Sequence, residues 1–265
     1  MSLKNELKSR KCQVMYITNM NIHCPICLNE LDGIVAPQIT LCGHIYCWPC
    51  ILRHLSYSKA AQFSSALMHY SAKGNISGKC PLCSEVILER DLKSADVHWV
   101  APLVTGEPIK LKLVRRNKND YAILEANSFD ENYTFCRIKK LSYQDIIRIH
   151  EWEINVMNQQ LNEFQEQDEE KEHLPFIITA IAKAQDLLKI AKDKLNEMPN
   201  LAKQKSKQEA ANYSDSKEED FSYFYQESNG LNVFLSPLCY KYLEAEYESC
   251  SKMPLEIKVS NYLLS

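Results

Sequence analysis

Seven cysteines and one histidine fall into four pairs between residues 24 and 83, and these pairs constrain the fold more than any other feature. The residues are Cys24, Cys27, Cys42, His44, Cys47, Cys50, Cys80 and Cys83. A two-residue gap lets two thiolates from one tight turn reach the same ion, and Zn²⁺ takes four such ligands in tetrahedral geometry. Eight ligands make two closed sites with no position left for water. We therefore expect two structural zinc ions.

Two other uses of these cysteines are less consistent with the sequence. Free thiols in a reducing compartment would show no regular C-x2-C spacing. A secreted disulfide framework would follow a signal peptide, and the N-terminal residues contain no apolar core of that kind. The four remaining cysteines also show no pairing pattern: Cys12, Cys136, Cys239 and Cys250.

The order of the ligands is as informative as their number. Histidine stands fourth and cysteine fifth, which is the C3HC4 order of a RING finger, whereas a PHD finger has the reverse. In that arrangement the first and third pairs share one zinc ion, and the second and fourth share the other. The interleaving allows a domain with a small apolar core to fold around its metals. One site is expected to hold Cys24, Cys27, Cys47 and Cys50, and the other Cys42, His44, Cys80 and Cys83.

Composition places the chain among soluble proteins of one to three small domains. It has 265 residues, of which 45% are hydrophobic and 25% charged, with a formal net charge of −3. The acidic balance gives no general attraction for nucleic acid. No apolar run approaches the roughly 18 residues of a membrane span, and we expect no membrane partner.

One short segment departs from this acidic balance. Four basic residues lie close together after the zinc-ligand module: Lys110, Lys112, Arg115 and Arg116. They indicate either a phosphate-facing patch or the solvated face of a strand.

Strand and helix patterns alternate after the module. Ile109, Leu111 and Leu113 alternate with polar residues, which predicts a half-buried strand, and residues 121–124 are a candidate returning strand. Ser142 and Asp145 have the spacing of a capping box, followed by a helical seam through Ile147–Phe164. His150 lies on that seam, where we expect a core or boundary position.

A second helix is predicted from Pro175 to about Met198, since proline is tolerated in a first turn and Pro199 ends the helix. The two helices form either an antiparallel hairpin or separate amphipathic helices. Further along, Asn229-Gly230 between apolar runs predicts a β-hairpin. Ser236-Pro237 could start a helix through Tyr247, and 255–259 could be a closing strand.

These patterns predict an α+β protein in which a zinc cross-brace module precedes a small β-containing body with a helical hairpin insertion. The two β regions are each too small to be stable alone, so we expect them to pack together. The expected divisions are an N-terminal extension (1–20), the C3HC4 module (21–90), a β segment (91–140), the helical hairpin (141–199), a polar linker (200–220), and a β-hairpin plus helix packing on the β segment (221–265).

Several stretches resemble one family of proteins. ITLCGHIYCWPCILRHLSYS followed by KCPLCSEVILERDLKS is similar to the zinc module of the eukaryotic RING finger protein ten family. The IKLKLVRR strand, the 147–164 helix and FSYFYQESNGLNVFLSPL extend the resemblance over most of residues 21–250. Two features depart from the family pattern: the chain ends at Ser265, and the gap between Cys50 and Cys80 is long. These features suggest a reduced version or a fragment.

The resemblance implies a cytoplasmic RING-type E3 ubiquitin ligase acting on proteins of the small ribosomal subunit, with ribosomal RNA as a further contact of the basic strand. Its partners would be an E2 ubiquitin-conjugating enzyme and ubiquitin. By motif position the E2-facing residues are Ile26, His54 and Pro81, although many RING fingers have a large apolar residue where His54 stands. Packing against the metal loop is the other interpretation of Ile26. No residue of the chain is expected to act as a catalytic nucleophile.

Ser84 leaves a second function open. Many RING fingers place an arginine or lysine directly after the eighth ligand, and serine cannot make that multi-donor contact. The alternative is a non-catalytic zinc-binding scaffold or ribosome-associated adaptor. A zinc-dependent DNA-binding protein is poorly supported, because no helix rich in arginine and lysine follows a zinc pair.

Overall fold

The structure is a computed structural model that describes residues 12–18, 22–62, 76–118, 123–128, 134–165, 172–197 and 220–260. Within these residues the chain forms two larger β sheets, one two-stranded ribbon and four α-helices. The ribbon pairs β4 (Ser77–Lys79) with β5 (Val86–Leu88) around the last ligand pair. The expected polar linker lies outside the described residues, apart from Asp220.

A five-stranded sheet joins the zinc-ligand module to the rest of the chain. Its strand order is β3-β2-β6-β1-β9, and only β1 and β6 run parallel. The module contributes two of its strands, and the others come from both sides of the module in sequence. The strands are β1 (Cys12–Thr18), β2 (Pro37–Ile39), β3 (Ile45–Cys47), β6 (Lys93–Trp99) and β9 (Ile138–Lys140).

This sheet differs from the expected division of the chain. The region expected as an N-terminal extension contains β1, which pairs with β6 from Val14↔Ala95 to Thr18↔Trp99. The region expected as one β segment, residues 91–140, is shared between the two sheets. Pairing of strands distant in sequence depends on backbone hydrogen bonds and packing that a local residue pattern does not record.

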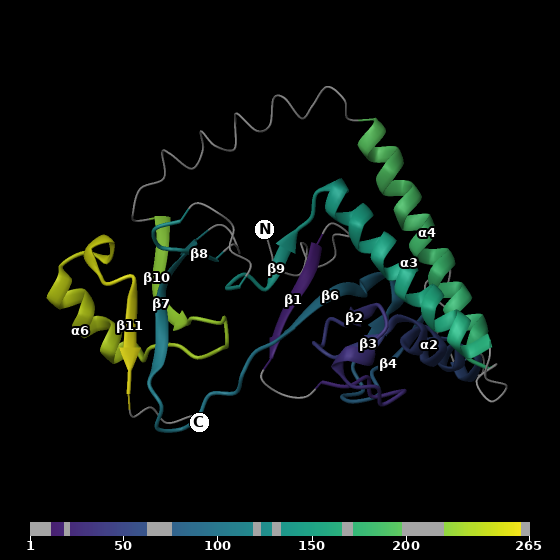
Figure 1. Ribbon diagram of the computed structural model, residues 1–265, viewed down its shortest axis with the longest axis horizontal. Coiled ribbons are helices and arrows are strands. Elements are labelled where there is room, and N and C mark those ends of the chain that lie inside the picture. The colour runs from purple at the N-terminus through teal and green to yellow at the C-terminus, as the bar shows by residue number, and fades with distance from the viewer. Residues whose placement is uncertain are drawn as a thin grey trace.

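The second sheet is centred on β7 (Ile109–Asn117), whose alternating Ile109, Leu111 and Leu113 are buried. The strand β10 (Phe221–Glu227) pairs antiparallel with it along most of its length. The short strands β8 (Ile123–Glu125) and β11 (Glu256–Val259) also pair with β7. The expected packing of the two β regions into one body is confirmed by these pairings. In Figure 1 this body lies at the opposite end of the molecule from the zinc-ligand module.

Helix α6 (Pro237–Tyr247) covers the core of this β body. It begins where Ser236-Pro237 predicted, and the Ser236 hydroxyl accepts a hydrogen bond from the Cys239 N–H at 3.3 Å. Tyr240 and Leu243 of the helix pack against a core that includes Tyr225 and Met253.

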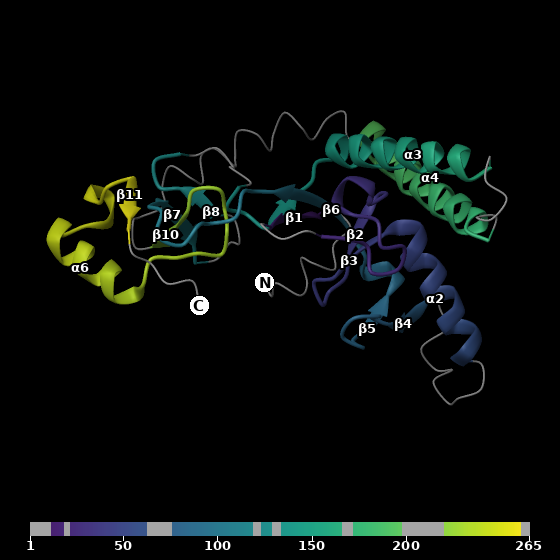
Figure 2. The ribbon, with the colours of Figure 1, turned by 60° about the horizontal axis from the view of Figure 1, so that its bottom comes forward.

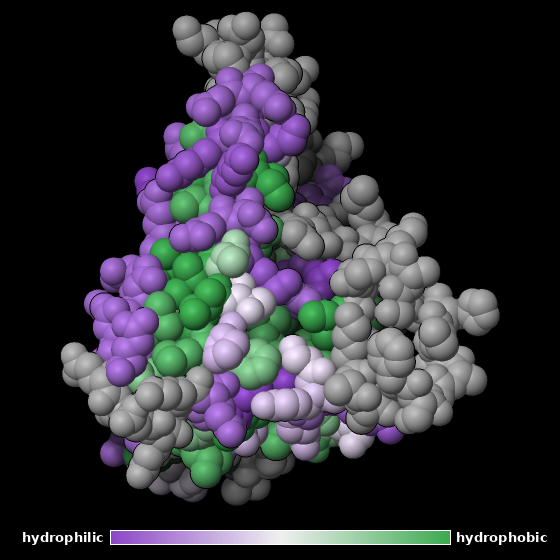
Figure 3. Space-filling model, turned by 90° about the vertical axis from the view of Figure 1, so that its right-hand side faces the viewer, coloured by the Kyte–Doolittle hydropathy of each residue, from purple (hydrophilic) through white to green (hydrophobic). Residues whose placement is uncertain are grey.

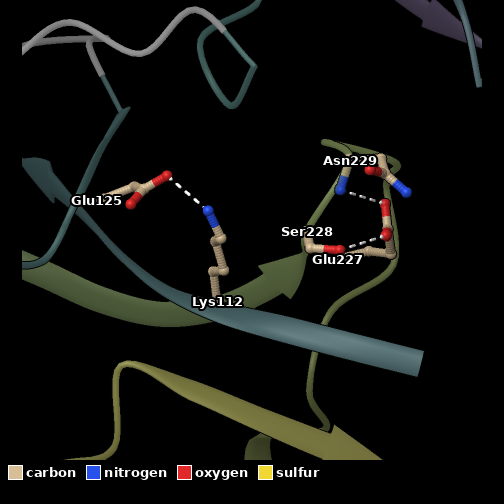
Figure 4. A network of polar contacts seen from close by, with 5 residues as sticks. All are labelled: Lys112, Glu125, Glu227, Ser228 and Asn229. Atoms are coloured by element: carbon tan, nitrogen blue, oxygen red, sulfur yellow. Dashed lines mark hydrogen bonds and ion pairs between the residues drawn. The ribbon is translucent and has the colours of Figure 1, made fainter. Parts of the chain in front are cut away.

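The Asn229-Gly230 turn forms and returns residues 233–235 antiparallel to β10. The returning segment makes one isolated bridge, Gln226↔Phe234, and backbone hydrogen bonds join Glu227 to Val233 and Leu235 to Tyr225, at 2.9 and 3.1 Å. The buried Glu227 carboxylate stabilises the turn by accepting a hydrogen bond from the Asn229 N–H at 2.9 Å (Figure 4). It also accepts one from the Leu231 N–H at 3.2 Å.

The segment that leads into β9 also contacts this turn. Arg137 Nη2 donates to the Gly230 carbonyl at 2.6 Å and to Asn232 Oδ1 at 2.9 Å. Burial lowers the pKa of Arg137. A Cβ at Gly230 would lie 2.1 Å from the Thr134 carbonyl oxygen and 2.8 Å from Ile17 of β1. The turn therefore connects the β body to the five-stranded sheet.

Helices α3 (Tyr143–Gln165) and α4 (Leu174–Asn196) lie side by side and form the expected hairpin (Figures 1 and 2). The predicted capping box is present: the Ser142 hydroxyl accepts from the Asp145 N–H at 3.1 Å, and the Asp145 carboxylate accepts from the Ser142 N–H at 3.1 Å. Hydrogen bonds from Ser142 hold the pKa of Asp145 below its usual range. Pro175 stands in the first turn of α4.

The hairpin packs on the zinc-ligand module and does not project from the β body. One continuous core contains Ile51 and Leu55 of α2 (Trp48–Gln62), Met157 of α3, and Ile177 and Ala184 of α4. Figure 2 shows the hairpin lying along one side of the module with α2 beneath it. The apolar seams predicted that each helix buries one face, but they did not indicate which part of the protein that face would pack against.

Apolar side chains also reach the surface at the helical end of the molecule. They gather in the middle of this face, below the polar side chains that cover its upper part (Figure 3). Tyr57 of α2 and Ile178 of α4 are 59% and 54% exposed, and the Tyr57 ring lies 6.0 Å from that of Phe176. Among the described residues, no helix has the length and apolar character needed to cross a membrane.

Candidate metal centre

The eight predicted ligands form two separate groups. Cys24, Cys27, Cys47 and Cys50 make one group, and Cys42, His44, Cys80 and Cys83 make the other. In each group the ligand atoms all lie within 4.8 Å of one another. The pairs interleave along the chain, so the two sites form the expected cross-brace.

The distances between ligand atoms fit tetrahedral zinc. Bonds of about 2.3 Å to sulfur place two thiolates about 3.8 Å apart, and the Cys27 and Cys47 sulfurs lie 3.7 Å apart. His44 Nδ1 lies 3.4 Å from the sulfurs of both Cys42 and Cys80, so Nδ1 is the nitrogen that would ligate. Thiolates with one imidazole are a donor set that Zn²⁺ favours. The module thus fits two structural zinc ions.

The first and last C-x2-C pairs share one backbone geometry. After the second cysteine of each pair comes a residue with a left-handed backbone, Leu28 and Ser84, both at φ 64°. Their N–H groups donate to the carbonyl oxygens of Cys24 and Cys80 at 2.7 and 2.9 Å. These tight turns aim both sulfurs of a pair at one point, which is why the two-residue spacing is needed.

Groups around the second site stabilise its thiolates. The buried Tyr46 hydroxyl lies 3.0 Å from the Cys80 sulfur, and the Thr40 hydroxyl lies 3.0 Å from that of Cys42. Burial raises the pKa of Cys80, but hydrogen bonds from Tyr46 and from the Cys83 and Leu82 backbone outweigh it and lower the pKa to about 6. Burial and the neighbouring Cys80 raise the pKa of Tyr46, so its hydroxyl keeps its proton and acts as a donor.

The thiols of the first site affect one another. Those of Cys27, Cys47 and Cys50 surround that of Cys24 and lower its pKa, whereas the Cys24 thiol raises the pKa of Cys47 and Cys50. The Cys47 N–H also donates to the Cys24 sulfur at 3.4 Å, and the Val35 N–H donates to the Cys47 sulfur at 3.3 Å. Such backbone donors orient the ligands of a metal site before the ion binds.

The structure brings two of the three predicted E2-facing residues to one part of the module. His54 Nε2 lies 2.7 Å from the Lys79 carbonyl oxygen, two residues before the exposed Pro81. Ile26 belongs to the first ligand pair and is partly buried against the module core. Ser84 is exposed and carries no charge, so the position after the eighth ligand lacks a cation.

Sequence patterns did not single out every residue that supports the module. Tyr46 precedes a ligand, but nothing in the spacing marks it as a hydrogen-bond donor to another. Glu153 of α3 was also missed. It is 1% exposed, and its carboxylate lies 2.7 Å from Nδ1 of the buried His150 and accepts from Gln38 Nε2 at 3.0 Å. A buried glutamate three residues after a seam histidine is visible in the sequence, but its partner on β2 is not.

Comparison with known families agrees with this geometry. The family model described as RING-type zinc-finger matches residues 24–81. The two-site module is a RING-type zinc finger.

Several curated relatives match a part of this chain. An uncharacterized RING finger protein of Schizosaccharomyces pombe is 32% identical over 100 residues, which cover 36% of this chain and 14% of that protein. E3 ubiquitin-protein ligase RMA1 of Arabidopsis thaliana is 33% identical over 25% of this chain and 22% of its own length. E3 ubiquitin-protein ligase MAG2 of Saccharomyces cerevisiae is 35% identical over 27% of this chain and 10% of its own. The chain therefore spans less than a quarter of each of these relatives. No solved structure matches it.

Proposed function

We propose that this chain is a RING-type E3 ubiquitin ligase, which recruits an E2~ubiquitin thioester and promotes transfer to a substrate lysine. The observation that carries the proposal is the complete cross-brace of two four-ligand groups. Three relatives that match about a quarter of this chain are named E3 ubiquitin-protein ligases, which supports it.

Such a ligase needs no nucleophile of its own. The RING holds the thioester in an orientation that a lysine can attack, so its contribution is proximity and orientation. The reacting cysteine belongs to the E2. Each zinc site has four protein ligands. This leaves no open coordination position for a metal-bound water, which agrees with a structural role.

The E2 would bind over the first and last ligand pairs and the start of α2. Ile26 and Pro81 offer apolar contacts on two tight turns whose geometry the zinc ions fix. The exposed Leu82 extends this surface. His54 supplies a polar group, and its hydrogen bond to the Lys79 carbonyl keeps the helix beside the second turn.

A discharge assay tests the proposal. Lysine-dependent loss of E2~ubiquitin, measured over a panel of E2 enzymes, should accelerate with the wild-type chain. Ile26→Ala should abolish the acceleration because it trims the contact, and both zinc ions should stay bound. Ile178→Ala is the matched control, since it removes the same atoms from an exposed position on α4. No acceleration with any E2, or an Ile26→Ala variant as fast as wild type, would contradict the proposed E2 surface.

Ser84 supports a second candidate function, a non-catalytic zinc-binding scaffold or ribosome-associated adaptor. The exposed serine offers no cation to bridge E2 and ubiquitin. Ser84→Arg distinguishes the candidates: if the missing cation limits a working ligase, this variant discharges E2~ubiquitin faster than wild type. If neither form accelerates discharge, the scaffold is the better description.

The ribosomal part of the proposal rests on the family resemblance. We propose small-subunit ribosomal proteins as substrates, which places the protein in the cytoplasm. The basic strand adds little support for an RNA contact, because three of its four basic side chains contact other residues of the β body, and Arg116 is the exposed fourth. Lys112 pairs with Glu125 at 2.9 Å (Figure 4), Lys110 pairs with Glu256 at 3.6 Å, and Arg115 lies over the Phe221 ring. Co-sedimentation with small subunits tests the association, and an RNA contact would weaken steeply with salt.

A further inference from the structure

The strand β11 forms one edge of the sheet in the β body. The strand order is β10-β7-β11, and β8 pairs with a later part of β7, so no described strand lies beyond β11. Helix α6 packs on one face of this sheet, below β11 in Figure 2, and both Glu256 and Lys258 of β11 are exposed. The outer edge of a strand carries backbone groups that can pair with another strand.

The hydrogen bonds to β7 show which backbone groups of β11 face outward. The Leu113 N–H donates to the Leu255 carbonyl oxygen at 2.8 Å, and Ile257 follows Leu255 by two residues. Because hydrogen-bonded pairs recur at every second residue of an antiparallel ladder, Ile257 also bonds to β7. Glu256 and Lys258 alternate with these residues, so their N–H and C=O groups point away from β7. No described residue bonds to these outward groups.

The side chains of the same two residues carry opposite charges. Glu256 forms an ion pair with Lys110 at 3.6 Å, whereas Lys258 lies directly opposite Lys110 in the strand register. Like charges directly opposite each other destabilise a strand pair. No described carboxylate forms an ion pair with Lys258. A carboxylate from beyond the edge would therefore be favourable beside Lys258.

A second copy of β11 supplies such a carboxylate. Two copies related by a twofold axis pair antiparallel, and their outward groups can bond only where Glu256 or Lys258 of one copy lies opposite Glu256 or Lys258 of the other. A register centred on either residue puts two like charges directly opposite each other. The register centred on Ile257 instead places each Glu256 opposite Lys258 of the second copy. It also places Leu255, which is 48% exposed, opposite Val259 of the second copy.

Charged residues on an edge strand commonly prevent pairing with another chain. An edge that carried a single sign of charge would do so, because every register would bring like charges together. The alternation of Glu256 and Lys258 makes this edge complementary to itself. The direction of the backbone groups, the charges and the apolar side chains all favour the same register.

We propose that the outer edge of β11 is a homodimer interface, in which two copies of this chain pair antiparallel about Ile257 and join their β bodies through one sheet. The proposal does not rest on the ligase activity. The β body lies at the opposite end of the molecule from the zinc-ligand module (Figure 1), so the dimer leaves both proposed E2 surfaces open.

Sedimentation velocity of the zinc-loaded full chain, measured over a series of protein concentrations, tests the proposal. The wild-type chain should show a reversible monomer–dimer equilibrium. Glu256→Lys and Lys258→Glu should each weaken dimerisation about tenfold, because each substitution turns both Glu–Lys pairs of the dimer into like-charge pairs. The double variant Glu256→Lys/Lys258→Glu should restore dimerisation, because it exchanges the two signs and keeps opposite charges facing each other.

Glu151→Lys is the matched control for a reversed charge. Glu151 lies on α3, is 52% exposed and forms an ion pair with Lys192 at 2.9 Å, much as Glu256 does with Lys110. This variant should dimerise as the wild-type chain does. A wild-type chain that stays monomeric at every concentration would overturn the proposal. So would a dimer that neither single variant weakens, or a double variant that remains as weak as the single ones.

A backbone variant tests whether the dimer forms through strand pairing. Lys258→Pro and Lys258→Ala both remove the charge, but only proline also removes the outward N–H, and it leaves the hydrogen bonds to β7 intact. Lys258→Pro should therefore dimerise more weakly than Lys258→Ala. Equal dimerisation of the two variants would overturn the pairing of β11 with its copy.

Discussion

At the scale of single residues, Tyr46 shows how the module controls its zinc. Its hydroxyl contacts the Cys80 sulfur at 3.0 Å, and the whole side chain is buried in the module core. Without this donor, the negative charge of the Cys80 thiolate is less well stabilised and its side chain is less firmly oriented toward the zinc ion. Hydrogen bonds of this kind typically change metal affinity about 10–100-fold.

Tyr46→Phe should therefore accelerate release of one zinc ion to a colorimetric chelator while the other ion is retained. The prediction assigns the fast ion to the site of Cys42, His44, Cys80 and Cys83. Tyr242→Phe, which removes a hydroxyl from a tyrosine 71% exposed on α6, should release both ions at the wild-type rate. Simultaneous acceleration of both ions in Tyr46→Phe would mean that the two sites do not act separately.

At the scale of elements, the RING and the helical hairpin share one core. Met157 of α3 is fully buried among residues of α2 and α4. Met157→Ala should lower the free energy of unfolding by about 2–5 kcal/mol, because it leaves a cavity in that core. Chemical denaturation measures this loss. A loss below about 1 kcal/mol would show that the hairpin is loosely packed there.

The shared core also predicts that metal and helices are coupled. Removing zinc with a chelator should lower hydrogen-exchange protection in α3 and α4 as well as in the RING, because the hairpin loses the surface that it covers. The β body should keep its protection, since its core is separate. Unchanged exchange in both helices would show that the hairpin is stable without the folded RING.

The elements themselves show what the sequence could predict. Local signals placed the ligand pairs, the Ser142 capping box and the start of α6, because each depends on residues within one turn of chain. The docking of α4 on α2, the parallel pairing of β1 with β6, and the partners of Glu153 depend on contacts between distant residues. An apolar seam or run predicts that one face of an element is buried, but it does not identify the element that packs against that face. The Asn229-Gly230 signal predicted the turn and could not predict that Arg137 would hold it.

At the scale of the whole molecule, one turn connects the β body to the five-stranded sheet. Gly230 has φ +82°, and an added Cβ would lie 2.1 Å from the Thr134 carbonyl oxygen. Gly106 has φ +93°, yet an added Cβ there meets nothing within 4 Å. A residue with a side chain would be strained by the positive φ at either glycine. Only at Gly230 would its Cβ also collide with a neighbouring backbone atom.

Gly230→Ala should therefore lower the thermal unfolding midpoint clearly more than Gly106→Ala, and limited proteolysis should cut faster between the β body and the sheet. The Gly106 variant measures the cost of the left-handed backbone, about 1 kcal/mol. Equal midpoints for the two variants would show that the turn does not hold the two parts together.

The proposed E2 surface and the core that the RING shares with the helical hairpin both depend on two structural zinc ions held by interleaved ligand pairs. Native mass spectrometry of the purified full chain tests this claim most directly. The mass should exceed that of the bare chain by two zinc ions, and Cys83→Ala should lose an ion from the second site while the first stays bound. One ion or none in the folded wild-type protein would contradict the account.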